Sequence, residues 1–471
     1  MRYRDLPASF RCLPILAVFA SFSAQVLALD PPADPLFTKT GNESQWHLPA
    51  VGLDAGAKSG WRTVRKAEPV TVAVIDSGLD WNHRDFDWNN LWHNDGEIAD
   101  NGIDDDGNGY VDDMIGYNFI GHNNKPWDHD GHGTFVAGLI AGSWNSEGIA
   151  GINPAARIMV LKALNSFGHT RASYIAEAIT YAVDNGARII NISVGGEGLI
   201  SMQKKAVDYA VSKGALIIIA AGNEGKELAG FGIAALPEVI TVGASDHDNR
   251  RVAFSNFGPE VDLLAPGIDI VSLRARYTDT LRDIPDTPYQ PSSAYVGGDR
   301  RYYMAGGTSF SAPIVTGIAS LLLSHDPSLS AADLKRMLLN SARDIETPGR
   351  DNLSGAGLVD AQAALLASPA FFVDAMISGV TVEQGSDGPM VKVLGTADAD
   401  QLASIRVEMG AGEKPESFSK GSAPISDSVV DGVVGTIPAA SFAGSGVWVL
   451  RLVVEHRNGT VREARFRLQL G

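Results

Sequence analysis

The sequence predicts an α/β domain with a doubly wound, mostly parallel sheet, followed by a small all-β sandwich domain. The first observation is that short apolar runs alternate with helical stretches through residues 45–367. The second is that these runs are continuous and rich in β-branched residues, which is typical of strands buried on both faces. The third is a change after residue 367, where short strand-like runs are separated by Gly, Ser and Pro.

Five continuous apolar runs are the expected strands of the α/β part. They are residues 70–75, 158–164, 189–194, 216–221 and 239–242. Helical stretches separate several of them, including residues 172–185 and 201–213. This alternation predicts helices on both faces of the sheet and ligands at the carboxyl ends of the strands.

The C-terminal region, residues 368–471, has the pattern of antiparallel strands. Its strand-like runs are residues 391–394, 405–409, 429–434, 446–454 and 460–470. Asn458 and Gly459 separate the last two, and Asn-Gly is the strongest short hairpin signal. About 100 residues of this kind predict an immunoglobulin-like or fibronectin-like sandwich. Substrate binding, surface binding and simple stabilisation all remain open as its role.

The first residues have the organisation of a signal peptide. Arg2, Arg4 and Arg11 precede an apolar stretch at 13–27, and small residues at 26–28 fit a cleavage site. We therefore expect a signal peptide over residues 1–28, a short extension over 29–44, and a protein that is secreted, periplasmic or at the cell surface. An uncleaved, anchoring signal helix is the alternative.

Composition limits the partners and the sources of stability. The chain has 55 acidic against 38 basic residues and a net charge of −17, which argues against nucleic acid as a partner. Cys12 is the only cysteine and would leave with the signal, so disulfides cannot stabilise the mature chain. Core burial and bound metal ions would have to do so. We expect a monomer without stable membrane insertion after signal removal.

Three short strings carry the chemistry, in the order Asp, His, Ser. Asp76 ends the apolar run at 70–75, His132 opens an apolar helical stretch, and Ser309 lies between a Gly-Gly-Thr string and the apolar helix at 312–323. Alone, each string fits an ordinary turn or loop. Together they supply the nucleophile, the base and the orienting carboxylate of acyl transfer.

The three strings resemble those of the subtilisin-like (subtilase) serine protease family, whose triad has this order. Residues 251–260, 264–267 and 355–361 continue the resemblance. It implies a serine endopeptidase acting on polypeptides, with Ser309 as nucleophile, His132 as acid and base, and Asp76 as its partner. The alternative is a non-catalytic surface or binding protein on a protease scaffold, which the lack of room for a folding prodomain before Gln45 would favour.

The resemblance also assigns the oxyanion hole and the substrate cleft. Asn223 follows an apolar run and would donate to the oxyanion beside the backbone N–H of Ser309, although Asn-Glu-Gly is also an ordinary turn string. The substrate would add as a strand between two chain segments. These segments contain Ser193, Val194 and Gly195 on one side and Gly168, His169 and Thr170 on the other.

A first structural calcium site is implied by the same resemblance. Six hard oxygen donors suit Ca²⁺. They are the side chains of Gln45, Asp85 and Asn145 and the carbonyl groups of Ser143, Glu147 and Ile149. A plain surface turn is the alternative.

A second calcium site is indicated by spacing in an Asp-rich stretch. Five residues follow the first half of an EF-hand loop. They are Asp104, Asp106, Asn108, Tyr110 through its carbonyl, and Asp112. Ile115 stands where the bidentate Glu would be, so a solvated loop without a cation is the alternative.

Overall fold

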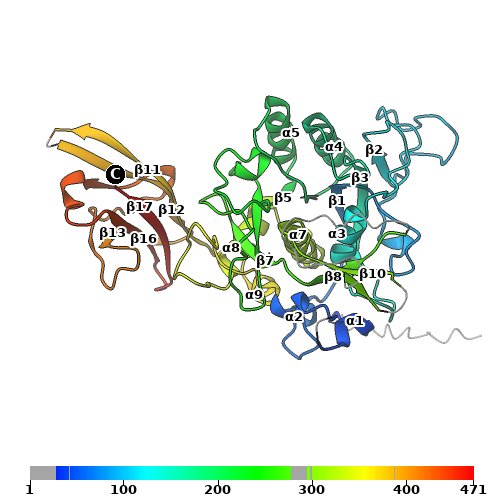
Figure 1. Cartoon of the computed structure of the whole chain (residues 1–471), viewed down its shortest axis with the longest axis horizontal. Coiled ribbons are helices and arrows are strands. Elements are labelled where there is room, and N and C mark those ends of the chain that lie inside the picture. Colours follow the sequence, from blue (N-terminus) through cyan, green and yellow to red (C-terminus); the bar gives the residue numbers. More distant parts are fainter. Residues whose placement is uncertain (1–27, 42, 277–293, 298–299, 387, 471) are drawn as a thin grey trace, which may run out of the picture.

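The computed structural model describes residues 28–41, 43–276, 294–297, 300–386 and 388–470, and the expected signal peptide, residues 1–28, lies almost wholly outside them. Figure 1 shows two parts side by side: a larger part with a central sheet and helices, and a C-terminal part made of strands. Within the described ranges, no helix is both long and apolar enough to cross a membrane.

The central sheet has seven strands, all parallel, in the order β2-β3-β1-β4-β5-β6-β7. The strands are β1 (Val70–Asp76), β2 (Gly116–Asn118), β3 (Ala156–Lys162), β4 (Ile189–Ile192), β5 (Leu216–Ala220), β6 (Ile240–Ser245) and β7 (Leu263–Pro266). The predicted strands correspond to β1, β3, β4, β5 and β6. The short edge strands β2 and β7 were not among them.

Helices cover both faces of this sheet, as the continuous apolar strands predict. Val72 and Val74 of β1 pack into one core with α3 (His132–Ala141) and α7 (Thr308–His325). The intervening Ala73 and Ile75 pack into a second core with α4 (Ala172–Asp184) and α5 (Ser201–Ser212). Alternate side chains of one strand therefore serve two cores, and the doubly wound prediction is confirmed.

Smaller elements complete the α/β part. An antiparallel sheet has the order β8-β10-β9, and short helices lie near the N-terminus and before the C-terminal part. These elements are α1 (Pro35–Thr38), α2 (His47–Ala50), β8 (Ile270–Leu273), β9 (Tyr295–Val296), β10 (Tyr302–Ala305), α8 (Ala331–Ser341) and α9 (Ala361–Leu366).

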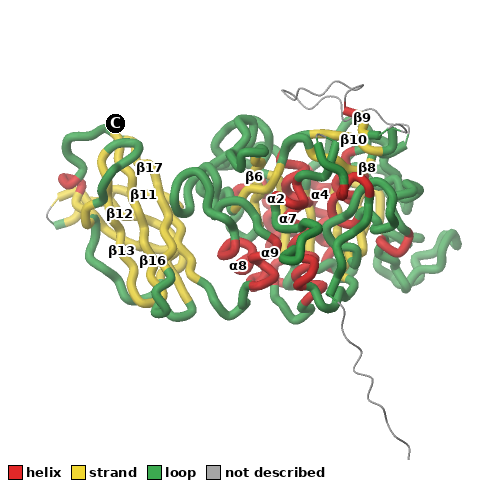
Figure 2. Tube along the Cα trace, turned by 90° about the horizontal axis from the view of Figure 1, so that it is seen from below, coloured by secondary structure: helices red, strands yellow, loops and turns green. Residues whose placement is uncertain are grey.

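The C-terminal part is built mainly of two antiparallel sheets, seen as the strand-rich region of Figure 2. One has the order β11-β12-β15 and the other β14-β13-β16-β17, and one apolar core lies between them. The strands are β11 (Val373–Gly385), β12 (Gly388–Ala399), β13 (Leu402–Ala411), β14 (Ser419–Lys420), β15 (Val429–Pro438), β16 (Val447–His456) and β17 (Val461–Gln469). The predicted hairpin joins β16 to β17, and Gly459 adopts a φ of +90° that favours glycine.

Backbone hydrogen bonds join the two parts. The Arg350 N–H donates to the carbonyl of Glu463 over 2.8 Å, and the Arg465 N–H donates to the carbonyl of Arg350 over 2.7 Å. The Arg462 guanidinium donates to the carbonyl of Asn340 at the end of α8. Strand β17 is therefore tied to the α/β part as well as to its own sheet.

Replacing Phe135 tests the core between the central sheet and α7. Phe135 is fully buried, and its ring centroid lies 4.4 Å from that of Phe310. We expect Phe135→Ala to lower the free energy of unfolding by about 3–5 kcal/mol, because the cavity cannot be filled by small shifts. Denaturant unfolding followed by tryptophan fluorescence measures this. Phe167→Ala is the control, since that side chain is 76% exposed; an equal loss in both variants would contradict the packing described.

Candidate active site

Asp76 and His132 form a hydrogen-bonded pair at the carboxyl end of the central sheet, with Asp76 buried and His132 partly exposed. Asp76 is the last residue of β1 and is fully buried, and His132 is the first residue of α3. His132 Nδ1 lies 2.8 Å from Asp76 Oδ1 and 3.0 Å from Oδ2. The Ser77 N–H also donates to Asp76 Oδ1, over 2.7 Å. This arrangement holds the proton on Nδ1 and leaves Nε2 of His132 to act as a base.

A second buried carboxylate, Asp128, fixes the loop before α3. Its Oδ1 accepts from the Ser77 hydroxyl and from the backbone of Asp130 and Gly131. Its Oδ2 accepts from both the N–H and the hydroxyl of Thr134. Asp128 thereby couples the chain after β1 to the first turn of α3. Sequence reasoning missed this residue, although an Asp four residues before a His-Gly-Thr string was a signal for it.

The acidic surroundings change the proton affinity of the imidazole. Burial lowers the pKa of His132, but Asp76, through its charge and hydrogen bond, together with Asp130 and Asp128, outweighs burial and raises the pKa to about 9. Burial raises the pKa of Asp130 to about 6, although the charge of His132 acts against this. These charges therefore stabilise the protonated form of His132, which is the form that a general base adopts after it has taken up a proton.

Ser309 lies in the first turn of α7, where the helix dipole favours negative charge. The helix begins before the predicted residues 312–323, which brings Ser309 into it. The Ser309 hydroxyl donates to the Ser193 carbonyl over 2.9 Å, and the Ser193 hydroxyl donates to the Ser309 carbonyl over 2.8 Å. The buried Phe310 ring lies 5.4 Å from the His132 ring, so α7 and α3 meet beside the predicted nucleophile.

Asn223 is oriented by the residue before Ser309. It follows β5, and its Oδ1 accepts from the Thr308 N–H over 2.9 Å and from the Thr308 hydroxyl over 3.0 Å. The Gly222 N–H donates in turn to the Thr308 hydroxyl. Because Oδ1 is engaged on that side, Nδ2 is the atom that Asn223 can offer to an incoming oxyanion.

The two predicted substrate segments follow β3 and β4, the strands on either side of β1. On one side, the Thr170 hydroxyl donates to the carbonyl of Ala163, and the N–H groups of Phe167 and His169 donate to Asn165. On the other side, Asn191 donates to the Ser193 hydroxyl. The order of the strands therefore brings both segments to the carboxyl end of the sheet, where Asp76 lies.

The residues of the first predicted calcium site also lie together. The Gln45 amide pairs with both backbone groups of Ala150, and Asp85 Oδ2 accepts from the Ile149 N–H over 2.8 Å. Asn145 accepts from the Glu147 N–H. No donor in the described part of the chain binds the carbonyl groups of Ser143, Glu147 or Ile149, the three predicted backbone ligands.

The surroundings of Asp85 are more suitable for binding a cation than for satisfying the carboxylate by hydrogen bonds alone. Its side chain is fully buried, and Oδ1 has no hydrogen-bond partner among the described residues. Burial raises the pKa of Asp85 to about 7, against the effect of the Ile149 N–H, and the charge of Asp34 acts in the same direction as burial. A buried carboxylate oxygen without a partner costs free energy that a divalent cation can remove.

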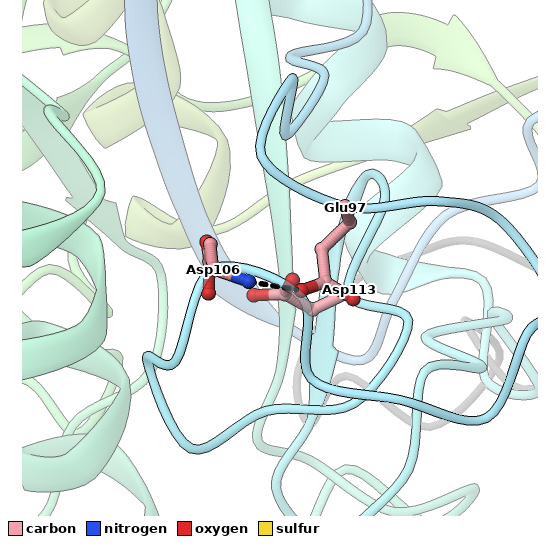
Figure 3. Close-up of side chains that lie close together, drawn as sticks. All are labelled: Glu97, Asp106 and Asp113. Carbon is pink, nitrogen blue, oxygen red and sulfur yellow. Dashed lines mark hydrogen bonds between the residues drawn. The ribbon is translucent and has the colours of Figure 1, made fainter.

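The Asp-rich loop has a different arrangement from the predicted EF-hand half. Glu97, Asp106 and Asp113 have carboxylate oxygens within 4.8 Å of one another and could hold a metal ion (Figure 3). Only Asp106 of these was in the predicted set. The Asp112 carboxylate instead accepts from the N–H groups of Asn101 and Gly102, and Asp104 accepts from those of Asn108 and Gly109.

Comparisons with known proteins identify the family of the chain. The model of the Subtilase family matches residues 67–357. A thermophilic serine proteinase of Bacillus sp. strain AK1 is 36% identical over 56% of this chain and 55% of its own length. Subtilisin amylosacchariticus of Bacillus subtilis subsp. amylosacchariticus is 33% identical over 63% of this chain and 65% of its own length.

The chain thus spans less than two thirds of the length of both relatives. Among solved structures, a protease from Pseudoalteromonas arctica superposes with a TM-score of 0.54 and 25% identity, over 71% of this chain and 99% of that one. The family match covers strand β1 and helices α3 and α7, which carry the predicted triad. The chain therefore belongs to the subtilase family.

Proposed function

We propose that this protein is an exported serine endopeptidase that hydrolyses polypeptides through Asp76, His132 and Ser309. The observation that carries the proposal is the hydrogen bond between the buried Asp76 carboxylate and His132 Nδ1, formed beside the start of α7, where Ser309 lies. A binding protein on a protease scaffold would have no need of this oriented imidazole.

The reaction begins when the Ser309 hydroxyl turns from the Ser193 carbonyl toward Nε2 of His132. Ser309 Oγ attacks the substrate carbonyl carbon while its proton passes to Nε2, and Asp76 stabilises the imidazolium without taking the proton. Asn223 Nδ2 and the Ser309 N–H donate to the oxyanion. His132 then protonates the leaving amine, and a water molecule, activated by the same imidazole, hydrolyses the acyl-enzyme.

The substrate binds as an extended strand between the segments that follow β3 and β4. Its backbone pairs with Gly168, His169 and Thr170 on one side and with Ser193, Val194 and Gly195 on the other. Backbone pairing of this kind accepts many sequences, because it uses groups that every residue has.

The chain divides into four proposed regions. They are a signal peptide at 1–28, a short extension at 29–44, the peptidase domain at 45–367 and a β-sandwich domain at 368–471. All proposed catalytic groups lie in the third region. The signal peptide accounts for export, and a mature chain without cysteine would depend on core burial and bound calcium for its stability.

Calcium is proposed as a structural ion. The first site would be held by Gln45, Asp85, Asn145 and the carbonyl groups of Ser143, Glu147 and Ile149. Bound calcium would supply a cross-link between the N-terminal segment, the chain after β1 and the loop after α3. In the acidic loop, the cluster of Glu97, Asp106 and Asp113 is a candidate beside the spacing-based set of Asp104, Asp106, Asn108, Asp112 and the Tyr110 carbonyl.

Replacing the nucleophile tests the reaction. We expect Ser309→Ala to lower hydrolysis of casein by about three or more powers of ten while thermal unfolding stays unchanged, because only the covalent route is lost. Labelling by a fluorophosphonate should also disappear. Ser311→Ala, a buried serine two residues away, is the control that should keep labelling. Equal labelling of wild type and Ser309→Ala would overturn the proposal, and absence of labelling in the wild type would favour a non-catalytic protein.

The pH dependence of activity should follow His132. General-base catalysis needs the neutral imidazole, so a raised pKa means that activity is present above it and is lost as the pH falls through it. We expect kcat/KM for a small peptide substrate to reach half its maximum near pH 9. Asp130→Asn should move this midpoint to lower pH, because a negative charge beside the imidazolium is removed. A midpoint that does not move in Asp130→Asn would contradict this electrostatic account.

Chelation should destabilise the folded chain. A cation that binds only the native state adds about 4 kcal/mol when its concentration is a thousandfold above Kd. We therefore expect a chelator to lower the melting temperature of wild type, and Asp85→Asn to remove most of this difference. Differential scanning calorimetry with calcium and with chelator measures both. Glu43→Gln, an exposed control near the same segment, should keep the full difference. Identical melting curves with and without chelator would argue against the calcium sites.

A further inference from the structure

The ring of Phe231 lies between two glycines at the carboxyl end of the central sheet. A Cβ added to Gly195 would lie 3.2 Å from Phe231 Cε1, and a Cβ added to Gly222 would lie 2.9 Å from the same atom. The Phe231 side chain is buried and belongs to the core that contains α4 and α5. The edge of one ring therefore occupies the space toward which both glycines would direct a side chain.

The proposed reaction directs a substrate side chain toward this space. Gly195 belongs to the segment after β4 along which the substrate backbone would pair, and Gly222 directly precedes Asn223, the proposed oxyanion donor. Strands β4 and β5 are parallel neighbours, so the segments that follow them leave the sheet side by side. The acyl residue of a substrate supplies the carbonyl group that Ser309 attacks. With its carbonyl oxygen at Asn223, this residue places its side chain between the two segments.

The residues on either side of Phe231 are attached to the segment after β4. The Gly198 N–H donates to the carbonyl of Gly230 over 3.1 Å. A Cβ added to Gly232 would lie 2.6 Å from the carbonyl oxygen of Gly196, so the two backbones are in close contact there. Gly232 also has a φ of +55°, which favours glycine. The backbone that carries the ring is thus held on both sides against the segment that the ring contacts.

We propose that Phe231 closes the pocket for the acyl residue of the substrate and restricts that residue to glycine, alanine or serine. This inference rests on the proposed function and narrows its substrate class. A substrate leucine or phenylalanine would have to displace the ring, whose burial stabilises the core, whereas a methyl group needs no such displacement. Backbone pairing accepts many sequences, so this pocket is where the chain selects among peptide bonds.

The test compares two peptides that differ only in the acyl residue, which is alanine in one and phenylalanine in the other. We expect kcat/KM of the wild type to be at least about a hundredfold higher for the alanine peptide. Phe231→Gly should raise the ratio of the phenylalanine value to the alanine value at least about tenfold, because the space between the glycines is opened. Both peptides are assayed on one preparation, so the ratio does not depend on the fraction of folded protein.

Two further variants separate the pocket from the stability of the loop. Phe231→Leu removes Cε1, the atom that lies against both glycines, but keeps most of the apolar burial, so the ratio should rise by a smaller factor. Phe257→Leu is the matched control. The Phe257 carbonyl accepts from the Leu228 N–H of the same loop over 2.8 Å, but its ring packs on the Arg251 guanidinium. The ratio in Phe257→Leu should equal that of the wild type.

A second measurement uses peptide aldehydes, which add reversibly to a serine hydroxyl and form a hemiacetal without a leaving group. Two aldehydes that differ only in the acyl residue, alanine or phenylalanine, are compared by their inhibition constants. In Phe231→Gly, inhibition by the phenylalanine aldehyde should strengthen relative to the alanine aldehyde by about the same factor as the kcat/KM ratio. A residue that only stabilised the fold would leave the relative strength of the two inhibitors unchanged.

The outcomes distinguish this inference from the proposed function. If the wild type cleaves neither peptide and takes up no fluorophosphonate label, the proposed function itself is wrong. If the wild type is labelled and cleaves the phenylalanine peptide as fast as the alanine peptide, the function stands and the role of Phe231 is overturned. A kcat/KM ratio that changes in neither Phe231→Gly nor Phe231→Leu would also overturn it.

Discussion

A carboxylate that is fully buried at the end of a strand needs hydrogen-bond donors around it, and Asp76 has them. Its partners are the Ser77 N–H and His132, which come from different elements. The first turn of α3 must therefore lie against the end of β1. Asp128 enforces this contact from the other side by binding Ser77 and Thr134 together. The geometry of the imidazole depends on this small buried network.

The order of the strands determines where the other proposed site residues lie relative to Asp76. Strands β3 and β4 flank β1, and β5 lies beside β4. The loops that follow these strands therefore lie together at the carboxyl end of the sheet. They contain the proposed substrate segments and Asn223. Helix α7 brings Ser309 to the same end of the sheet, and reciprocal hydrogen bonds between Ser309 and Ser193 fix the first turn of the helix. The end of strand β1 and the first turns of α3 and α7 carry the proposed triad, and the parallel sheet sets the spacing between them.

A different constraint governs the opposite end of α3. The loop at residues 143–149 is bound by Gln45 through Ala150, by Asp85 and by Asp34, which come from three separate parts of the chain. Among the described residues, carboxylates from two of these parts each leave one buried oxygen without a hydrogen-bond partner. The divalent cation proposed above would interact favourably with these charges. In a mature chain without cysteine, such an ion would act as the cross-link that a disulfide provides elsewhere.

The sequence by itself determined the alternation of strands and helices, the change to an all-β C-terminal part and the three strings around Asp76, His132 and Ser309, because these features depend on local periodicity and short-range turn chemistry. The sequence pattern did not predict the edge strands β2 and β7 or the strand β11. These strands are short or alternate only weakly, and they depend on their neighbours in a sheet. Only the tertiary structure decided which acidic residues meet. It grouped Glu97 and Asp113 with Asp106 in place of Asp112, and Asp34 with Asp85, because the positions of carboxylates distant in sequence are set by how loops cross and not by spacing along the chain.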